Sequence, residues 1–139
     1  MLFPAAIDPV LCQSIEELEL ESEKLKSVMS GKQPIGQNRP KTVVSSVEQY
    51  VRDPCVVSYV LNVSAGICEC CNKSAPFAKS NGEPYLEVHH VRHLAAGGSD
   101  TITNAVAKCP NCHRELHHGL NSVELAEKLY FNLDRLMRE

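Results

Sequence analysis

Two kinds of metal-binding side chain gather in the second half of this 139-residue chain, and the first kind is cysteine. Cys68 pairs with Cys71, and Cys109 pairs with Cys112, each in a C-x-x-C unit. A C-x-x-C turn presents two thiolates on one side, so two such turns complete a tetrahedral site for Zn²⁺. Because four protein ligands leave no open position, we predict a structural zinc site that contributes folding energy and does not catalyse.

Two further cysteines need a different interpretation. Cys70 lies inside the first C-x-x-C unit, but only Cys68 and Cys71 have the correct spacing, so Cys70 is expected to be the spare thiol. Cys55 falls in a predicted helix and is interpreted as a small buried apolar residue. The N-terminus has no basic segment and reaches Asp8 too early for a signal peptide, which favours a cytoplasmic protein. Paired cysteines in that compartment favour metal binding over disulfides.

Histidine is the second kind, and its spacing suits an open metal site. His113 and His117 are four residues apart and share one face of a predicted helix. Together with His89 they would hold one divalent ion. Three neutral imidazoles leave positions for water and a phosphate oxygen, which is the arrangement of a catalytic site.

The remaining histidines are expected to play other parts. His90 follows His89 directly, and neighbouring residues on a strand point to opposite faces. Near a strand end, His90 could still reach a water molecule beside the metal ion. His93 and His118 are interpreted as bystanders.

Three motifs in this region together resemble those of a known nuclease family. L-E-V-H-H, G-G-S-D-T-x-x-N and C-P-N-C-H-R-E-L-H-H-G are similar to motifs of the HNH (ββα-metal) endonucleases. The similarity is greatest to the zinc-stapled HNH domains of modification-dependent (5-methylcytosine-type) restriction enzymes, and it covers roughly Arg52 to Gly119. It implies an α+β fold with a treble-clef-like ββα-metal core. A four-cysteine zinc site would staple this core, and α-helices would flank it.

The resemblance also implies a role for each matching residue. His89, His113 and His117 correspond to the ligands of one catalytic divalent metal, which would be Mg²⁺, Mn²⁺, Ni²⁺, Co²⁺ or Zn²⁺. His90 corresponds to the general base, and Asn104 to the asparagine that holds this base in register. The implied reaction is hydrolysis of DNA phosphodiester bonds to leave 5′-phosphate and 3′-hydroxyl ends.

Charged residues near the histidines leave alternatives open. Glu87, two residues before His89, would either orient an imidazole or be a plain surface carboxylate. Arg114 and Lys108 would either meet phosphates or be ordinary solvated charges.

The elements that position these groups follow from local signals. Ser14 and Glu17 form a capping box that opens an acidic amphipathic helix over residues 14–29, and a Gly/Pro-rich linker follows at 31–40. We therefore predict an N-terminal unit over 1–42 and a nuclease domain with flanking helices over 43–139.

Within the second unit, the pattern predicts several elements in order. The first are a short helix at 43–51, a helix from Pro54 that ends at Gly66, and a hairpin turn at Asn81-Gly82. Strands follow near 85–91 and at 105–108, and then a helix from Pro110 to Gly119. The last helix begins at about Ser122, with Asn121 as its cap and Met137 on its apolar stripe.

The formal net charge of −3 is not that of a strong free-standing DNA binder. Two alternatives to an autonomous nuclease therefore stay open. One is a catalytically silent, zinc-stabilised module that binds DNA or protein. The other is a nuclease fragment whose specificity depends on a partner, with a homodimer or docking partner recruited through the 14–29 helix. No apolar run approaches the length of a membrane span.

Overall fold

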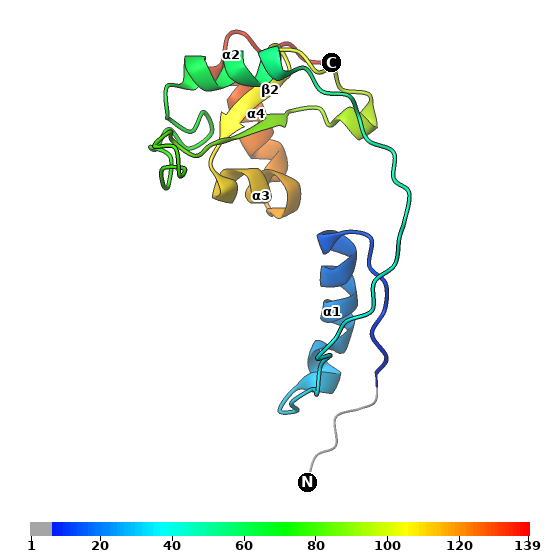
Figure 1. Ribbon diagram of the computed structural model, residues 1–139. Coiled ribbons are helices and arrows are strands. Elements are labelled where there is room, and N and C mark those ends of the chain that lie inside the picture. The colour runs from blue at the N-terminus through cyan, green and yellow to red at the C-terminus, as the bar shows by residue number, and fades with distance from the viewer. Residues whose placement is uncertain (1–6) are drawn as a thin grey trace. The chain divides into compact units, whose positions relative to one another are not determined.

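The computed structural model describes residues 7–139 of the chain, which divide into two compact units at residues 46 and 47 (Figure 1). The first unit contains helix α1, Ile15–Met29, followed by an irregular segment. Ser14 caps α1 by accepting a hydrogen bond from the Glu17 backbone N–H at 3.1 Å. Glu17 in turn accepts a hydrogen bond from the backbone of Gln13 at 2.7 Å. The predicted helix and its cap are confirmed.

The helix predicted at residues 43–51 is wrong. These residues are exposed and have no regular structure. The segment is rich in valine, a β-branched residue that loses side-chain freedom in a helix. A helix this short is stable only when tertiary packing supports it, and these exposed side chains have little of that packing.

The second unit begins with α2, Pro54–Ser64, and its start follows the prediction. The Asp53 carboxylate accepts the Cys55 N–H at 2.8 Å, and Pro54 occupies the first helical turn. Ala65 ends the helix in the left-handed conformation, one residue before the predicted Gly66. The interpretation of Cys55 as buried is wrong, because it lies exposed in the first turn, away from the core positions Val56 and Val60.

A two-stranded antiparallel sheet forms the centre of this unit. Strand β1 is Glu87–His90 and strand β2 is Ala105–Lys108, with Glu87 opposite Lys108 and His90 opposite Ala105. Before β1, an isolated bridge between Ala78 and Pro84 closes the predicted turn at Asn81-Gly82.

The sheet separates two small cores. On one face, Ala105 and Ala107 pack with Val56 and Val60 of α2. On the other face, Val106 packs with residues of the two C-terminal helices, among them Leu129. These helices are α3, Pro110–His118, and α4, Ser122–Asn132, with the 3₁₀ turn η1, Leu94–Ala96, between the strands. Figure 1 shows α2 on one side of the strands and α3 on the other.

Two details of the C-terminal segment differ from the predictions. Asn121 precedes α4 but makes no side-chain capping bond, because its backbone is not in the extended conformation of a usual cap. Met137 is exposed, since α4 ends at Asn132; Leu136 enters the core instead. In the part of the chain that the structure describes, no helix is both long and apolar enough to cross a membrane.

Candidate metal centres and active site

The four predicted cysteines come together in one cluster. The sulfur atoms of Cys68, Cys71, Cys109 and Cys112 all lie within 4.8 Å of one another, and none of the cysteines among residues 7–139 forms a disulfide. The first pair lies in the loop after α2, whereas the second lies at the start of α3. The cluster therefore links the loop before the sheet to the helix after it.

The sulfurs of this cluster differ in how easily they ionise: the pKa of Cys68 is lowered, whereas burial raises the pKa of Cys71 and of Cys112. The backbone N–H groups of Cys109 and Cys71 point at the Cys68 sulfur at 3.3 and 3.5 Å. Burial acts to raise the pKa of Cys68, but these backbone hydrogen bonds outweigh it and lower the pKa to about 7. A thiol that ionises this easily is ready to ligate a metal ion. Cys70 lies outside the four, and burial raises its pKa.

Three of the predicted histidines form a second cluster. The ligating nitrogens of His89 on β1 and of His113 and His117 on α3 lie within 4.8 Å of one another. The ring centre of His89 is 4.5 Å from that of His113 and 4.7 Å from that of His117. Burial, reinforced by nearby positive charge, lowers the pKa of His89 to about 2, so its imidazole is neutral and able to ligate.

Glu87 contacts one of these rings directly. One carboxylate oxygen lies 2.8 Å from Nδ1 of His113, and the other accepts a hydrogen bond from the Tyr85 hydroxyl at 2.7 Å. Because Nδ1 is engaged in this way, Nε2 of His113 remains available to a metal ion. Of the two interpretations of Glu87, the structure matches the one in which it orients an imidazole. Arg114 lies exposed on α3, next to His113.

His90 lies on the other side of the strand, as the alternation of side chains requires. It is almost fully buried, and its Nε2 is 2.7 Å from Oδ1 of Asp100. The Asp53 backbone N–H at the start of α2 holds the second Asp100 oxygen at 2.7 Å. Among residues 7–139, the histidine cluster does not include His90. Asp100 was not singled out in the sequence, and its place in the G-G-S-D-T motif was the only available signal.

Asn104 is fully buried and fixes the loop that follows His90. Its amide donates hydrogen bonds to the carbonyls of Arg92 and Ser99, at 2.9 and 2.8 Å, and its side-chain oxygen accepts the Arg92 N–H at 2.9 Å. The Val91 N–H also donates to the Asn104 carbonyl at 2.8 Å. This one side chain therefore holds both ends of the loop between residues 92 and 99.

His93 lies closer to the cluster than its spacing indicated. Its ring centre is 5.1 Å from that of His89 and 4.8 Å from that of His117. The chain bends after β1, so residues 89 and 93 approach one another although they lie on no common helix. His118 lies farther out, with its ring centre 5.9 Å from that of His117.

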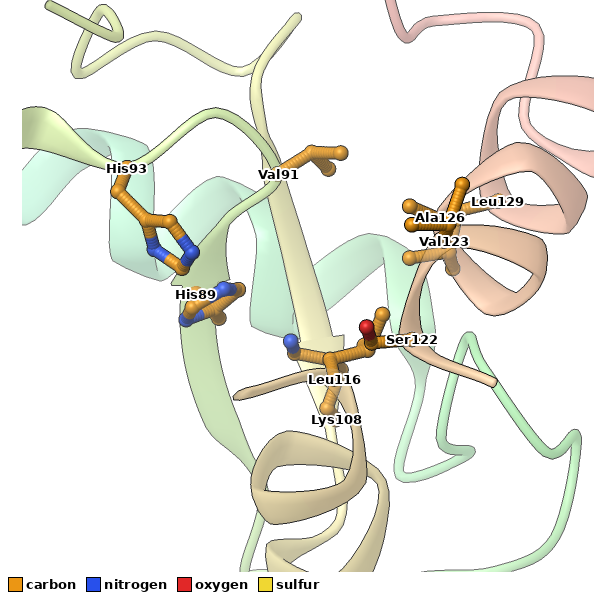
Figure 2. A pocket seen from close by; sticks show the side chains of 9 residues that line it. All are labelled: His89, Val91, His93, Lys108, Leu116, Ser122, Val123, Ala126 and Leu129. Atoms are coloured by element: carbon orange, nitrogen blue, oxygen red, sulfur yellow. The ribbon is translucent and has the colours of Figure 1, made fainter. Parts of the chain in front are cut away.

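A small pocket of about 160 Å³ opens beside His89 and His93 (Figure 2). Lys108 contributes to its wall from β2 and is 0% exposed. Burial lowers the pKa of Lys108 to about 8, against the opposing effect of Cys70, Cys112 and Cys68. Among the described residues, its Nζ has no hydrogen-bond partner.

Two antiparallel strands followed by a helix, with one closed and one open cluster of metal-binding groups, define a ββα-metal domain. The family model of the HNH endonucleases matches residues 68–119, a segment that contains both clusters, His90 and Asn104. Over this segment the chain is therefore similar to the HNH endonucleases, and the match leaves the rest of the chain outside it.

Two individual proteins extend this similarity beyond the domain. The chain is 51% identical over 117 residues to the Type IV methyl-directed restriction enzyme EcoKMcrA of Escherichia coli K12, a match that spans 84% of this chain and 42% of that enzyme. It also matches the structure of the Type IV phosphorothioation-dependent restriction endonuclease ScoMcrA, with a TM-score of 0.57 and 30% identity over 86% of this chain and 21% of the other. The chain thus spans less than half the length of either protein.

Proposed function

We propose that the protein is a metal-dependent endonuclease that hydrolyses DNA phosphodiester bonds and leaves 5′-phosphate and 3′-hydroxyl ends. The observation that carries this proposal is the pairing of an open cluster of three histidines with a closed cluster of four cysteines, inside a segment of the HNH endonuclease family. Only the open cluster leaves coordination positions for a substrate oxygen.

The two clusters suit different ions. Four thiolates in tetrahedral spacing favour Zn²⁺, which we assign a structural role. Three imidazoles would hold one catalytic divalent ion, and nitrogen ligands favour Ni²⁺, Co²⁺ or Zn²⁺ over Mg²⁺ and Mn²⁺. When bound, such an ion supplies Lewis-acid stabilisation for the charge that develops on the phosphate and on the leaving 3′ oxygen.

His90 is proposed to accept the proton of the attacking water. Its contact with Asp100 involves Nε2, so the tautomer with hydrogen on Nε2 leaves the lone pair of Nδ1 free to act as a base. Asn104 would keep this base in register through the loop that it clamps immediately after His90. Arg114, exposed beside His113 on α3, is proposed to contact the DNA backbone.

The relatives suggest the biological role. One is a methyl-directed restriction enzyme and the other a phosphorothioation-dependent restriction endonuclease. We therefore propose that this protein acts in the cytoplasm, in restriction of modified or foreign DNA. Since the chain spans less than half of each relative, specificity for a modification would come from a further segment or from a partner.

A second candidate is a DNA- or protein-binding module without catalysis. The net charge of −3, which is not that of a strong free-standing DNA binder, favours the protein-binding form of this module. Exposed apolar residues on α1, among them Ile15, Leu18 and Leu20, favour a homodimer or a docking partner at that helix.

One experiment separates these candidates. Purified protein is incubated with supercoiled plasmid, with and without cytosine methylation, in Mg²⁺, Mn²⁺, Ni²⁺, Co²⁺ or Zn²⁺. We expect nicking or linearisation that His90→Ala reduces by at least about 100-fold, in line with loss of a general base. Cleavage that survives this substitution would remove His90 from the mechanism. Binding without cleavage of either DNA in every metal would favour the silent module.

A further inference from the structure

The pocket beside His89 has the features of an anion site. We propose that it binds a phosphate group of the DNA backbone, with Lys108 as its buried cation. The inference rests on the proposed nuclease function and adds a substrate contact to it. Lys108 occupies no position of the HNH motifs described above.

The sheet directs Lys108 to the histidine side. Glu87 stands opposite Lys108, and His89 stands opposite Val106, so these four side chains share one face of the two-stranded sheet. Figure 2 shows the amino group of Lys108, which lines the pocket, turned toward His89. An anion in the pocket would therefore lie next to the proposed catalytic metal site.

The lining of the pocket supplies hydrogen-bond donors and contains no acidic side chain, although Glu87, opposite Lys108 on the sheet, acts electrostatically on the lysine from outside the lining. Lys108, His89, His93 and Ser122 line it together with apolar side chains, and none of the described lining residues is acidic. Its volume of about 160 Å³ is several times the roughly 30 Å³ that one water molecule occupies in the liquid, so it has room for a phosphate group.

The state of Lys108 without a ligand supports this role. Its side chain is 0% exposed, and its Nζ has no hydrogen-bond partner among residues 7–139. A buried charged group without a partner is costly, and such groups are normally paired. Because Nζ is not accessible in the structure, the Lys108 side chain would turn further into the pocket, where a phosphate oxygen would provide the missing charge-assisted hydrogen bond.

A competing role for Lys108 is to balance the charge of the cysteine cluster. Lys108 precedes Cys109, and the sulfurs of Cys70, Cys112 and Cys68 interact electrostatically with it. In that case Lys108→Met would weaken zinc binding and leave contacts with DNA unchanged. The two roles therefore predict opposite results.

The test measures DNA binding by the full chain, without added divalent metal, as a function of salt concentration. Each phosphate contact contributes about 0.9 to the slope of log affinity against log salt. We expect Lys108→Met, which keeps the size of the side chain, to lower that slope by about 0.9 and to retain zinc. Lys128→Met, which removes an exposed charge of α4, is the matched control and is expected to leave the slope unchanged.

A second pair of variants tests the phosphate site even if Lys108→Met does not fold. Ser122→Asp places a carboxylate in the pocket at the first position of α4, where an acidic residue suits the helix, and Ser122→Asn is its uncharged control. We expect only the aspartate variant to weaken DNA binding, by roughly tenfold. Equal binding by both variants, or an unchanged slope in Lys108→Met, would overturn the proposal.

Inorganic phosphate distinguishes the source of the anion. It is titrated into wild type and Lys108→Met and followed by ³¹P nuclear magnetic resonance. One outcome would be phosphate binding that depends on Lys108, together with an unchanged slope of DNA affinity against salt in Lys108→Met. This outcome would mean that the pocket binds only free phosphate, and it would overturn the proposed contact with the DNA backbone. None of these measurements requires cleavage, so the two proposals can fail separately. A protein that binds DNA through Lys108 without cutting it would contradict the proposed function but not the phosphate contact of Lys108.

Discussion

At the scale of single residues, Glu87 links the sheet to His113 of α3. Its carboxylate lies between the Tyr85 hydroxyl and Nδ1 of His113, at 2.7 and 2.8 Å. Burial acts to raise the pKa of Glu87, but the hydrogen bonds from Tyr85 and His113 lower it overall, so the group is ionised at neutral pH. An ionised carboxylate on the second ring nitrogen strengthens an imidazole as a metal ligand.

Substitution of Glu87 by glutamine should therefore weaken metal binding without removing a ligand. We expect a loss of about 10- to 100-fold in affinity for Ni²⁺ at the histidine cluster, measured by isothermal titration calorimetry on zinc-loaded protein. Glu83→Gln, an exposed carboxylate of the preceding turn, is the control. Equal affinities in the two variants would show that Glu87 is only a surface group.

The buried His89 makes stability depend on pH in a definite direction. Its pKa in the folded protein is about 2, because burial and nearby positive charges disfavour the imidazolium, against an ordinary value of 6.5. Below about pH 6.5 the unfolded chain takes up a proton that folded His89 does not, so the free energy of unfolding falls as the pH falls. Lowered pKa values of His93 and His117, which burial also causes, act in the same direction.

We expect zinc-loaded wild type, without added catalytic metal, to be less stable at about pH 5.5 than at about pH 7.5 in urea denaturation. His89→Gln should show a smaller decrease over the same range, because it removes the largest of the three shifts. The same decrease in both proteins would contradict the assignment of the effect to His89.

Sequence reasoning named the residues of both clusters but not the residues that support them. C-x-x-C spacing and the helical spacing of His113 and His117 are local, so they indicate which side chains share a side. The contact of His90 with Asp100 depends on the path of the loop between the strands, which Asn104 holds. The approach of His93 to the cluster depends on the bend after β1. Neither path follows from local spacing.

At the scale of elements, the cysteine cluster and one ion pair tie the loop after α2 to the rest of the domain. Glu69, in that loop, accepts hydrogen bonds from both terminal nitrogens of Arg135, at 2.6 and 2.8 Å. Arg135 also donates to the carbonyls of Ala105 and Ile102, at 2.8 and 3.1 Å. The partners are 66 residues apart, so no sequence pattern indicated this pair.

The pair is largely buried, with 16% of the arginine side chain and 8% of the glutamate side chain exposed. Arg135→Met should therefore destabilise the domain by about 3–5 kcal/mol, because it leaves a buried carboxylate unpaired. The double variant Arg135→Met with Glu69→Met should recover much of this loss, as judged by thermal denaturation. No difference between the single and the double variant would contradict this account of the pair.

The cysteine cluster should matter more than any single contact in this loop. We expect the wild-type protein to hold one zinc ion per chain and Cys109→Ser to lose it and unfold, since metal binding and folding are linked in such sites. Zinc content is measured by atomic emission and folding by circular dichroism. Cys70→Ser is the control, and it should keep both properties because Cys70 lies outside the cluster. A folded Cys109→Ser protein would refute the structural role of the metal.

At the scale of the whole molecule, the division into two units places all the proposed chemistry in residues 47–139. The helix of the first unit was readable from its capping box. The short helix expected at 43–51 did not form, because nothing there supports it by packing. The chain is acidic overall, so the proposed affinity for DNA is concentrated at the metal and at a few cations such as Lys108, and not spread over a basic surface.

The central claim is that the histidine cluster holds the ion that makes DNA cleavage possible. The most direct test follows plasmid cleavage and cluster occupancy together as Ni²⁺ or Mn²⁺ is titrated into zinc-loaded protein. We predict that the cleavage rate rises in step with occupancy, and that His113→Ala loses metal binding and cleavage together while it keeps its structural zinc. Cleavage by His113→Ala at the wild-type rate, or in wild type before the cluster is occupied, would contradict the account.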